Sequence, residues 1–226
     1  MRELPILMAA DPVRAILAGR KTQVRRPMKP QPACRCGNPN WKAQKINWIG
    51  YKYENKYGWF CHTCGSGLIK VDEWSSHGIL SPYQVGDLLY VRETWCLVND
   101  TDYGGELWVD YRATPRYDES LPAGWHNAPD YLGALKWRPA IHMPKWVTRL
   151  WLEVVKVRVE KLQDITLEDV KAEGIHGYTF AMGVLSENPP DPRWAFIDLW
   201  DSINNKVGKR WNDNPYCWVY DFKVAE

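Results

Sequence analysis

Two close pairs of cysteines constrain this chain more than any other feature, because four thiolates at such spacings form a tetrahedral metal site. Cys34 and Cys36 make a CxC pair, 24 residues separate Cys36 from Cys61, and Cys61 with Cys64 makes a CxxC pair. A glycine follows each pair and lets the backbone turn tightly around an ion. We therefore predict a structural zinc ion (Zn) bound by all four cysteines, with His62 as a reserve ligand.

Disulfide bonds are the alternative use of these cysteines. Glu3 and Pro5 interrupt any secretion signal at the start of the chain, so we expect a cytoplasmic protein, in the host cytoplasm if a phage encodes it, whose thiols stay reduced. Cys96 and Cys217 lie singly in strand-like runs, as small buried apolar residues do. No apolar run approaches the roughly 20 residues that a helix needs to span a membrane, so no membrane partner is expected.

Basic residues are concentrated around the first cysteine pair. Ten Lys or Arg and no Asp or Glu lie between Pro12 and Tyr53, which leaves 19 basic and 27 acidic residues elsewhere in the chain. Trp41, Trp48 and Tyr51 are interleaved with these cations. Because phosphates attract cations and bases stack on aromatic rings, the segment predicts a nucleic-acid partner. A solvated basic loop without a partner is the plain alternative.

We expect one main domain interrupted by an insertion. Turn-rich sequences bound residues 30–80, which form the zinc-binding insertion, while residues 1–29 and 81–226 form the main domain. Strand patterns outnumber helix patterns in that domain and do not alternate with them in a βαβ order. The expected fold class is therefore α+β, a small mixed β-barrel with a few flanking helices.

A short helix, a glycine turn and a cation-rich strand are expected in succession near the start of the chain. Asp11 and Pro12 are typical of a helix start, and the helix should end at Ala18, just before Gly19. Alternation then places Lys21, Gln23 and Arg25 on one face of the strand and Thr22, Val24 and Arg26 on the other. Because both faces carry a cation, the plain interpretation is a solvated edge strand.

Two later helices and four longer strands complete the expected elements. Thr166, with Asp169 three residues later, predicts the start of a helix that ends at Glu173. A third helix should begin at Asp191 and Pro192. Its apolar stripe comprises Trp194, Ile197, Trp200 and Ile203. The expected strands cover residues 88–91, 106–112, 147–162 and 216–224.

With these elements in order, the sequence resembles the ASCH (activating signal cointegrator homology) superfamily of PUA-like β-barrels, and more closely its phage and prophage branch. The matching segments are residues 18–22 with Arg26, 86–95, 137–146 and 166–174. The resemblance implies a barrel cleft that binds RNA or a modified nucleobase, which is favoured over duplex DNA. It leaves the oligomeric state open.

Some members of this superfamily resemble amidohydrolases that deacylate N4-acetylcytidine with a lysine, a threonine nucleophile and a glutamate, and others resemble ribonucleases. Lys21 matches the lysine and Glu173 the glutamate, but Val24 occupies the nucleophile's position, three residues after the lysine. Thr22 lies nearly 7 Å along the strand from that position, whereas a nucleophile must lie within about 3 Å of its base. Direct attack by water is the remaining route for an enzyme.

The leading expectation is a nucleic-acid-binding protein of this superfamily. The residues expected to bind nucleic acid are Arg20, Lys21, Arg25, Arg26, Glu93 and Trp95. The alternative is a hydrolase of the same family, with Lys21, Thr22 and Glu173 as its catalytic residues. A zinc-stabilised protein-interaction module is a third hypothesis.

Overall fold

The structure is a computed structural model that describes residues 1–29, 31, 43–44, 58–59, 81–99, 107–115, 137–175 and 191–225. The chain divides into two compact units. Unit 1 comprises Met1–Lys21, Asp87–Glu153 and Lys223–Glu226, and unit 2 comprises Thr22–Gly86 and Val154–Phe222. The four cysteines of the predicted zinc site and nearly all of the expected insertion lie outside the described residues.

The described strands form one five-stranded sheet and two strand pairs. The large sheet has the order β1-β5-β8-β9-β2, and the pairs are β3 with β4 (Ala43–Gln44 and Gly58–Trp59) and β6 with β7. The mixed α+β class is as predicted. The described strands do not close into a barrel, because β1 and β2 are the two edges of the sheet and each has one neighbour.

Unit 1 contains the parallel part of the sheet. β1 (Glu3–Leu7) runs parallel to β5 (Leu88–Arg92), and β5 pairs antiparallel with the start of β8 (Trp151–Lys161). The sequence analysis predicted β5 and did not predict β1, whose five residues carry Pro5 and little alternation. β8 was expected from Val147 but begins at Trp151, because Lys145–Val147 forms a 3-10 turn (η4).

Helix α1 (Ala10–Leu17) follows β1 and buries Val13 and Ile16. The helix begins at Ala10 with Ala9 as the N-cap, so the predicted cap at Asp11 is wrong by two residues. The Asp11 carboxylate instead forms an ion pair with Arg14, one turn further along the helix. The helix end is as predicted.

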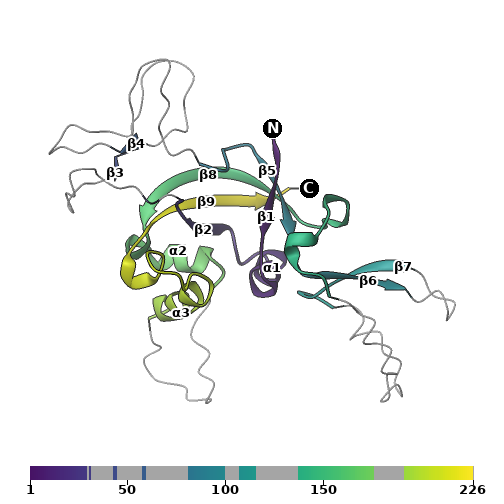
Figure 1. Cartoon of the computed structure of the whole chain (residues 1–226). Coiled ribbons are helices and arrows are strands. Elements are labelled where there is room, and N and C mark those ends of the chain that lie inside the picture. The colour runs from purple at the N-terminus through teal and green to yellow at the C-terminus, as the bar shows by residue number, and fades with distance from the viewer. Residues whose placement is uncertain are drawn as a thin grey trace, which may run out of the picture. The chain divides into compact units, whose positions relative to one another are not determined.

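A hairpin of β6 (Trp95–Asn99) and β7 (Leu107–Tyr111) is the second part of unit 1 and is drawn at the right of Figure 1. Trp95, Met143 and Val147 form its buried apolar cluster. Met143 and Val147 come from a following segment that also contains a second 3-10 turn, η3 (Ala140–His142). The segment of residues 137–150 therefore packs back onto the hairpin.

Unit 2 contains the antiparallel pair of β2 (Gln23–Pro27) and β9 (Tyr216–Val224), and β9 has the bounds predicted for the last strand. Helices α2 (Leu167–Ala172) and α3 (Arg193–Ile203) lie on the same side of these strands in Figure 1. The predicted capping box at Thr166 and Asp169 is present, and Glu173 is the C-cap of α2. Two 3-10 turns, η5 (Leu162–Asp164) and η6 (Trp211–Asp213), complete this unit's described elements.

The side of helix α3 that faces the core matches the predicted stripe only in part. It begins after Asp191 and Pro192 as expected, and the Asp191 carboxylate accepts a hydrogen bond from the backbone N–H of Arg193. Phe196 and Trp200 are its buried residues, and they pack with Leu162, Ile165, Val170 and Cys217. Trp194, which is 59% exposed, and Ile203 belong to the predicted stripe but face away from this core. The prediction is right for Trp200 and wrong for Trp194 and Ile203, because the apolar residues of α3 occupy more than one face.

Candidate nucleic-acid interface

Three separate chain segments meet at one end of the β6–β7 hairpin in unit 1. Trp95, the first residue of β6, pairs with Tyr111, the last residue of β7. Arg138 forms an isolated antiparallel bridge with Trp95, through backbone hydrogen bonds of 2.7 and 3.2 Å. The backbone therefore fixes the positions from which the neighbouring side chains project.

Three arginines stack on aromatic rings at this end of the hairpin. The distance from the guanidinium carbon to the ring centroid is 5.1 Å for Arg138 on Trp95, 5.3 Å for Arg112 on Trp137 and 4.0 Å for Arg149 on Tyr111. These distances are typical of cation–π contacts. We call these six residues the arginine–aromatic cluster.

Glu93 orients one of these arginines from within the protein. Its side chain is 1% exposed and accepts hydrogen bonds from Arg149 Nε at 2.9 Å and Arg149 Nη2 at 3.0 Å. Arg149 Nη1 also donates to Thr114 Oγ1 at 2.7 Å. A bidentate pair of this kind fixes the plane of the guanidinium group. Glu93 therefore sets the geometry of Arg149 and does not itself face solvent.

The Tyr111 ring beneath Arg149 is also fixed by its hydroxyl group. Tyr111 Oη donates a hydrogen bond of 2.6 Å to the carbonyl oxygen of Val147. Desolvation raises the pKa of Tyr111 above its ordinary value, although the nearby Arg149 charge opposes the change. The hydroxyl group therefore stays protonated at neutral pH and keeps donating this bond.

Two members of the cluster keep an unneutralised charge. Arg112 and Arg138 are exposed, and within the part of the chain that the structure describes neither has a carboxylate partner. Arg149, by contrast, is paired with Glu93. Arg112 and Arg138 are therefore the cations of the cluster that are available to an external anion.

A second group of charged side chains lies inside unit 2, around Arg25. The Arg25 side chain is 1% exposed, and its guanidinium nitrogens lie 2.8 Å from Glu160 Oε2, 3.0 Å from Asp169 Oδ2 and 3.8 Å from Glu173 Oε1. The predicted residues Arg25 and Glu173 are thus brought together. The face that carries Lys21, Gln23 and Arg25 is buried, so β2 is an edge strand without the solvated polar face of the plain interpretation.

A second arginine completes this group. Arg158 Nη1 lies 2.7 and 2.8 Å from the two carboxylate oxygens of Asp221, and Arg158 Nη2 lies 2.7 Å from Asp169 Oδ1. Gln23 Nε2 donates to the same two aspartates, at 3.0 Å to Asp169 and 2.9 Å to Asp221. We call the group the carboxylate cluster. Its members are Gln23, Arg25, Arg158, Glu160, Asp169, Glu173 and Asp221.

The surroundings of Asp169 hold it in its ionised form. Desolvation opposes ionisation, but hydrogen bonds from Gln23 and from the Thr166 backbone, with the charge of Arg25, lower the pKa of Asp169 to about 2. In the same unit, burial raises the pKa of the Cys217 thiol to about 12, so this cysteine is an inert core residue at neutral pH. Cys96 and Cys217 are both free and buried, as predicted.

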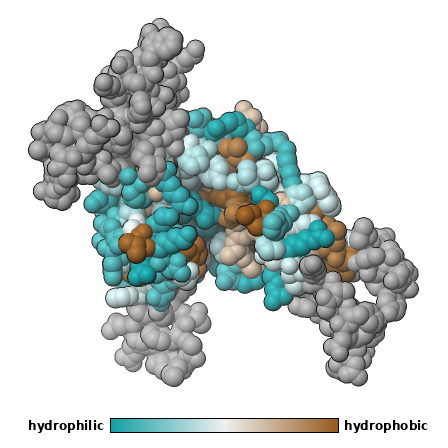
Figure 2. Space-filling model, viewed as in Figure 1, coloured by the Kyte–Doolittle hydropathy of each residue, from teal (hydrophilic) through white to brown (hydrophobic). Residues whose placement is uncertain are grey.

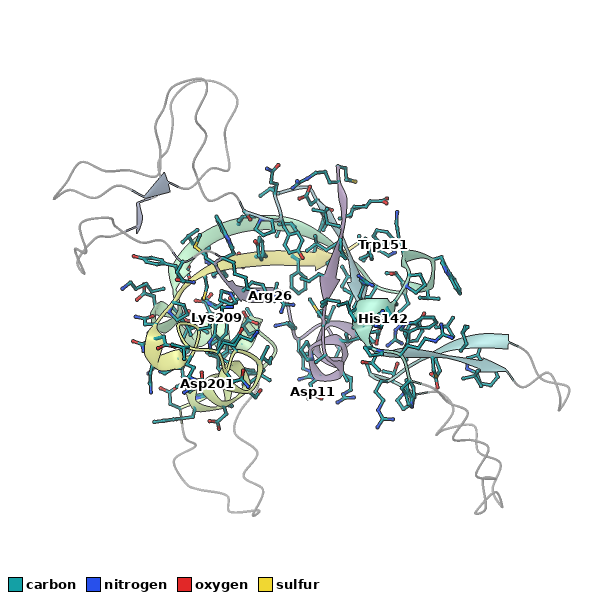
Figure 3. The ribbon with its side chains drawn as sticks, in the orientation of Figure 1. Asp11, Arg26, His142, Trp151, Asp201 and Lys209 are labelled. Carbon is teal, nitrogen blue, oxygen red and sulfur yellow. The ribbon has the colours of Figure 1, made fainter. Side chains whose placement is uncertain are left out.

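The remaining predicted residues fall in both units. Arg20 is exposed and Lys21 is buried at the end of the first segment of unit 1. Thr22 is the exposed first residue of unit 2, and its backbone N–H donates to the carbonyl oxygen of Ala172 at 2.8 Å. Val24, at the expected nucleophile position, is buried. Arg26, which is labelled in Figure 3, is half-buried.

Glu93 and Trp95 were predicted as site residues, but Arg112, Arg138 and Arg149, which contact Trp137, Trp95 and Glu93 respectively, were not. The sequence pattern that could have indicated Arg112 and Arg138 is an aromatic residue followed directly by an arginine, which occurs at Tyr111–Arg112 and at Trp137–Arg138. Arg158 and Glu160 of the carboxylate cluster were also not predicted. The sequence places these two charges on one face of a strand that is otherwise rich in valine, and charged side chains placed there need partners.

The metal prediction falls on residues that are not described. Across the described ranges, no three His, Cys, Asp or Glu side chains are grouped to hold a metal ion, and the four predicted zinc ligands lie elsewhere.

No helix in the described part of the chain combines the length and the apolar character needed to cross a membrane. On the face drawn in Figure 2, hydrophilic residues predominate among the coloured atoms, and apolar residues lie between them.

Comparison with protein-family models, with curated proteins and with solved structures finds no match to this chain. Two groups of side chains therefore remain as candidate sites. The carboxylate cluster is partly buried and each of its carboxylates lies near Arg25 or Arg158, whereas Arg112 and Arg138 of the arginine–aromatic cluster are exposed.

Proposed function

We propose that the protein binds nucleic acid through the arginine–aromatic cluster of unit 1, with RNA or a modified nucleobase favoured over duplex DNA as the ligand. One observation carries this proposal. Arg112 and Arg138 are exposed, each lies over a tryptophan ring, and neither has a carboxylate partner among the described residues.

A stacked arginine suits a phosphate better than a freely rotating one. The ring restricts the guanidinium group before the ligand arrives, so less side-chain entropy is lost when two N–H groups bind two phosphate oxygens. The backbone bridge between Arg138 and Trp95 adds to this restriction. The cluster therefore offers anion-binding groups that are already oriented.

The local charge balance favours a polyanion over a single small anion. Arg149 and Arg14 lie beside the same turn, through hydrogen bonds to Thr114 Oγ1 and to the Ala113 carbonyl oxygen. Arg149 is paired with Glu93 and Arg14 with Asp11, so both contribute mainly to shape. Arg112 and Arg138 remain as two separate positive centres, which suits successive phosphates along a strand.

The class that we propose is an ASCH-type protein of the PUA-like group, with residues 30–80 as a zinc-binding insertion. The mixed α+β fold, the glycine turn after α1 and the capping box of α2 support it. The proposal also includes a closed barrel and a bound zinc ion. The basic segment would then add long-range attraction for phosphates to the contacts made by the cluster.

Salt-dependent binding tests the function. We expect a fluorescein-labelled single-stranded RNA to bind with an affinity that falls steeply as salt rises from low to physiological concentration. The double variant Arg112→Ala/Arg138→Ala should bind more weakly. Its slope of log affinity against log salt should be smaller by roughly 1.4, since each phosphate contact on a single strand contributes about 0.7.

Arg193→Ala is the matched control, because Arg193 is an exposed arginine of unit 2 that is already paired with Asp191. It should leave both affinity and slope unchanged. Affinity that does not depend on salt, or a double variant that binds like the wild type, would contradict the proposal.

A further inference from the structure

The segment of residues 137–150 in unit 1 combines positive charge with exposed apolar side chains. It contains two arginines, one lysine and one histidine, and it contains no Asp or Glu. Trp146 is 71% exposed and Ile141 is 59% exposed. Figure 3 labels His142, within this segment, and Trp151, just beyond its end. The exposed indole ring of Trp146 is accessible to a flat ligand.

The backbone that carries Trp146 is held on both sides. The Val147 N–H donates to the Pro144 carbonyl oxygen, and the Thr148 N–H donates to the Lys145 carbonyl oxygen at 3.0 Å. The Lys145 ammonium pairs with Glu3 and lies 5.5 Å from the centre of the Trp151 ring. The residue after Trp146 has a buried side chain. Trp146 therefore projects from an ordered turn.

This turn is joined directly to the arginine–aromatic cluster. The carbonyl oxygen of Val147, the residue after Trp146, accepts the hydrogen bond from Tyr111 Oη. Tyr111 is the ring on which Arg149 stacks, and Arg149 lies three residues after Trp146. The exposed indole and the cluster therefore belong to one connected part of unit 1.

We propose that Trp146 is a stacking platform for an unpaired base of a single-stranded nucleic acid, an inference that rests on the proposed function and specifies its ligand. A flat indole matches the face of a base, and the exposed Arg138 of the same segment suits an attached phosphate. In a duplex both faces of an internal base are already stacked, so only an unpaired base can cover the ring. The platform thus selects single strands over duplexes.

The experiment compares two labelled probes. One is a single-stranded RNA of about 12 nucleotides, within the usual site sizes of single-strand binders, and the other is the blunt-ended duplex of the same sequence, which has no unpaired base. Trp146→Ala should weaken binding of the single strand roughly 5- to 150-fold, the range measured for loss of one stacked base. Trp146→Phe should restore much of that loss, because it retains a ring. Binding of the duplex should not change in either variant.

Trp194→Ala is the matched control, since Trp194 is also well exposed but lies on α3 of unit 2. It should bind both probes as the wild type does. If the wild type binds RNA and Trp146→Ala binds the single strand equally well, the stacking platform is refuted while the proposed function stands. Equal weakening of both probes would also refute it, because the effect would then be structural. A wild type that binds neither probe would overturn the proposed function itself.

Discussion

Replacement of Arg25 by methionine tests whether the carboxylate cluster is a stability element of unit 2. The substitution keeps a long side chain in a site where Arg25 is 1% exposed, and it removes the charge that faces Glu160, Asp169 and Glu173. Glu160 and Asp169 then share one remaining arginine, Arg158, which also holds Asp221. Removing one partner of a buried ion pair costs about 3–5 kcal/mol. For a chain of this size, the melting temperature should fall by roughly 6–20 °C.

The loss of stability in Arg25→Met should depend on pH in a defined direction. In the wild type the pKa of Asp169 is lowered to about 2, so the stability it contributes is present at neutral pH and is lost as pH falls from about 4 to about 2. Without Arg25 the cluster should bind protons at higher pH, because its negative charges repel one another. The difference in melting temperature between wild type and variant should therefore be largest near pH 7 and should shrink as pH falls below about 4.

Thermal melts followed by circular dichroism from pH 7 to pH 3 would measure this difference. Arg193→Met is the control, because it removes an exposed arginine paired with the neighbouring Asp191. That variant should melt like the wild type at every pH. A melting temperature of Arg25→Met within about 1 °C of the control, or a difference that is constant with pH, would refute the reasoning.

Two further predictions concern the metal and the hydrolase alternative. The purified protein should contain one zinc ion per chain, and the Cys61→Ser variant should lose both the metal and thermal stability. Elemental analysis measures the zinc content and a thermal melt measures the stability. Full retention of zinc and of stability by the variant would exclude the four-cysteine site. The wild type should show little or no deacylation of N4-acetylcytidine, because Val24 is apolar and buried, and Val24→Thr supplies a hydroxyl at nearly the same volume. Rapid turnover by the unaltered protein, abolished by Lys21→Ala, would instead favour the enzyme.

Elements whose signals are local could be predicted from the sequence. The capping box of α2 needs only Thr166 and Asp169, three residues apart, and the structure contains it. Strand β9 has a long run of alternating apolar residues and was predicted with its observed bounds. The end of α1 depended on Gly19, whose φ of +69° is readily accessible only to a glycine.

Elements that depend on distant partners could not be predicted. β1 was missed because its strand conformation comes from pairing with β5, more than eighty residues later in the chain. The start of α1 was misplaced because Asp11 found a partner in Arg14, whereas the cap position is held by Ala9 without a side-chain bond. The buried side of α3 was misassigned in part because several of its faces carry apolar residues, and only the packing with η5 and α2 selects Phe196 and Trp200.

The strand after Gly19 shows most clearly how tertiary contacts change the meaning of a sequence pattern. Alternation correctly placed Gln23 and Arg25 on one face, but it could not show that carboxylates from β8 and α2, such as Glu160 and Asp169, cover that face. Arg25 and Lys21 are therefore buried, and the charge of this cation-rich strand is only partly available to a ligand. A count of charges along the sequence overestimates the positive charge that this strand presents to solvent. It gives no sign of Arg112 and Arg138, because these residues are separated from the basic segment in sequence and are oriented by tryptophans. For this reason we place the centre of the proposed interface at the β6–β7 hairpin.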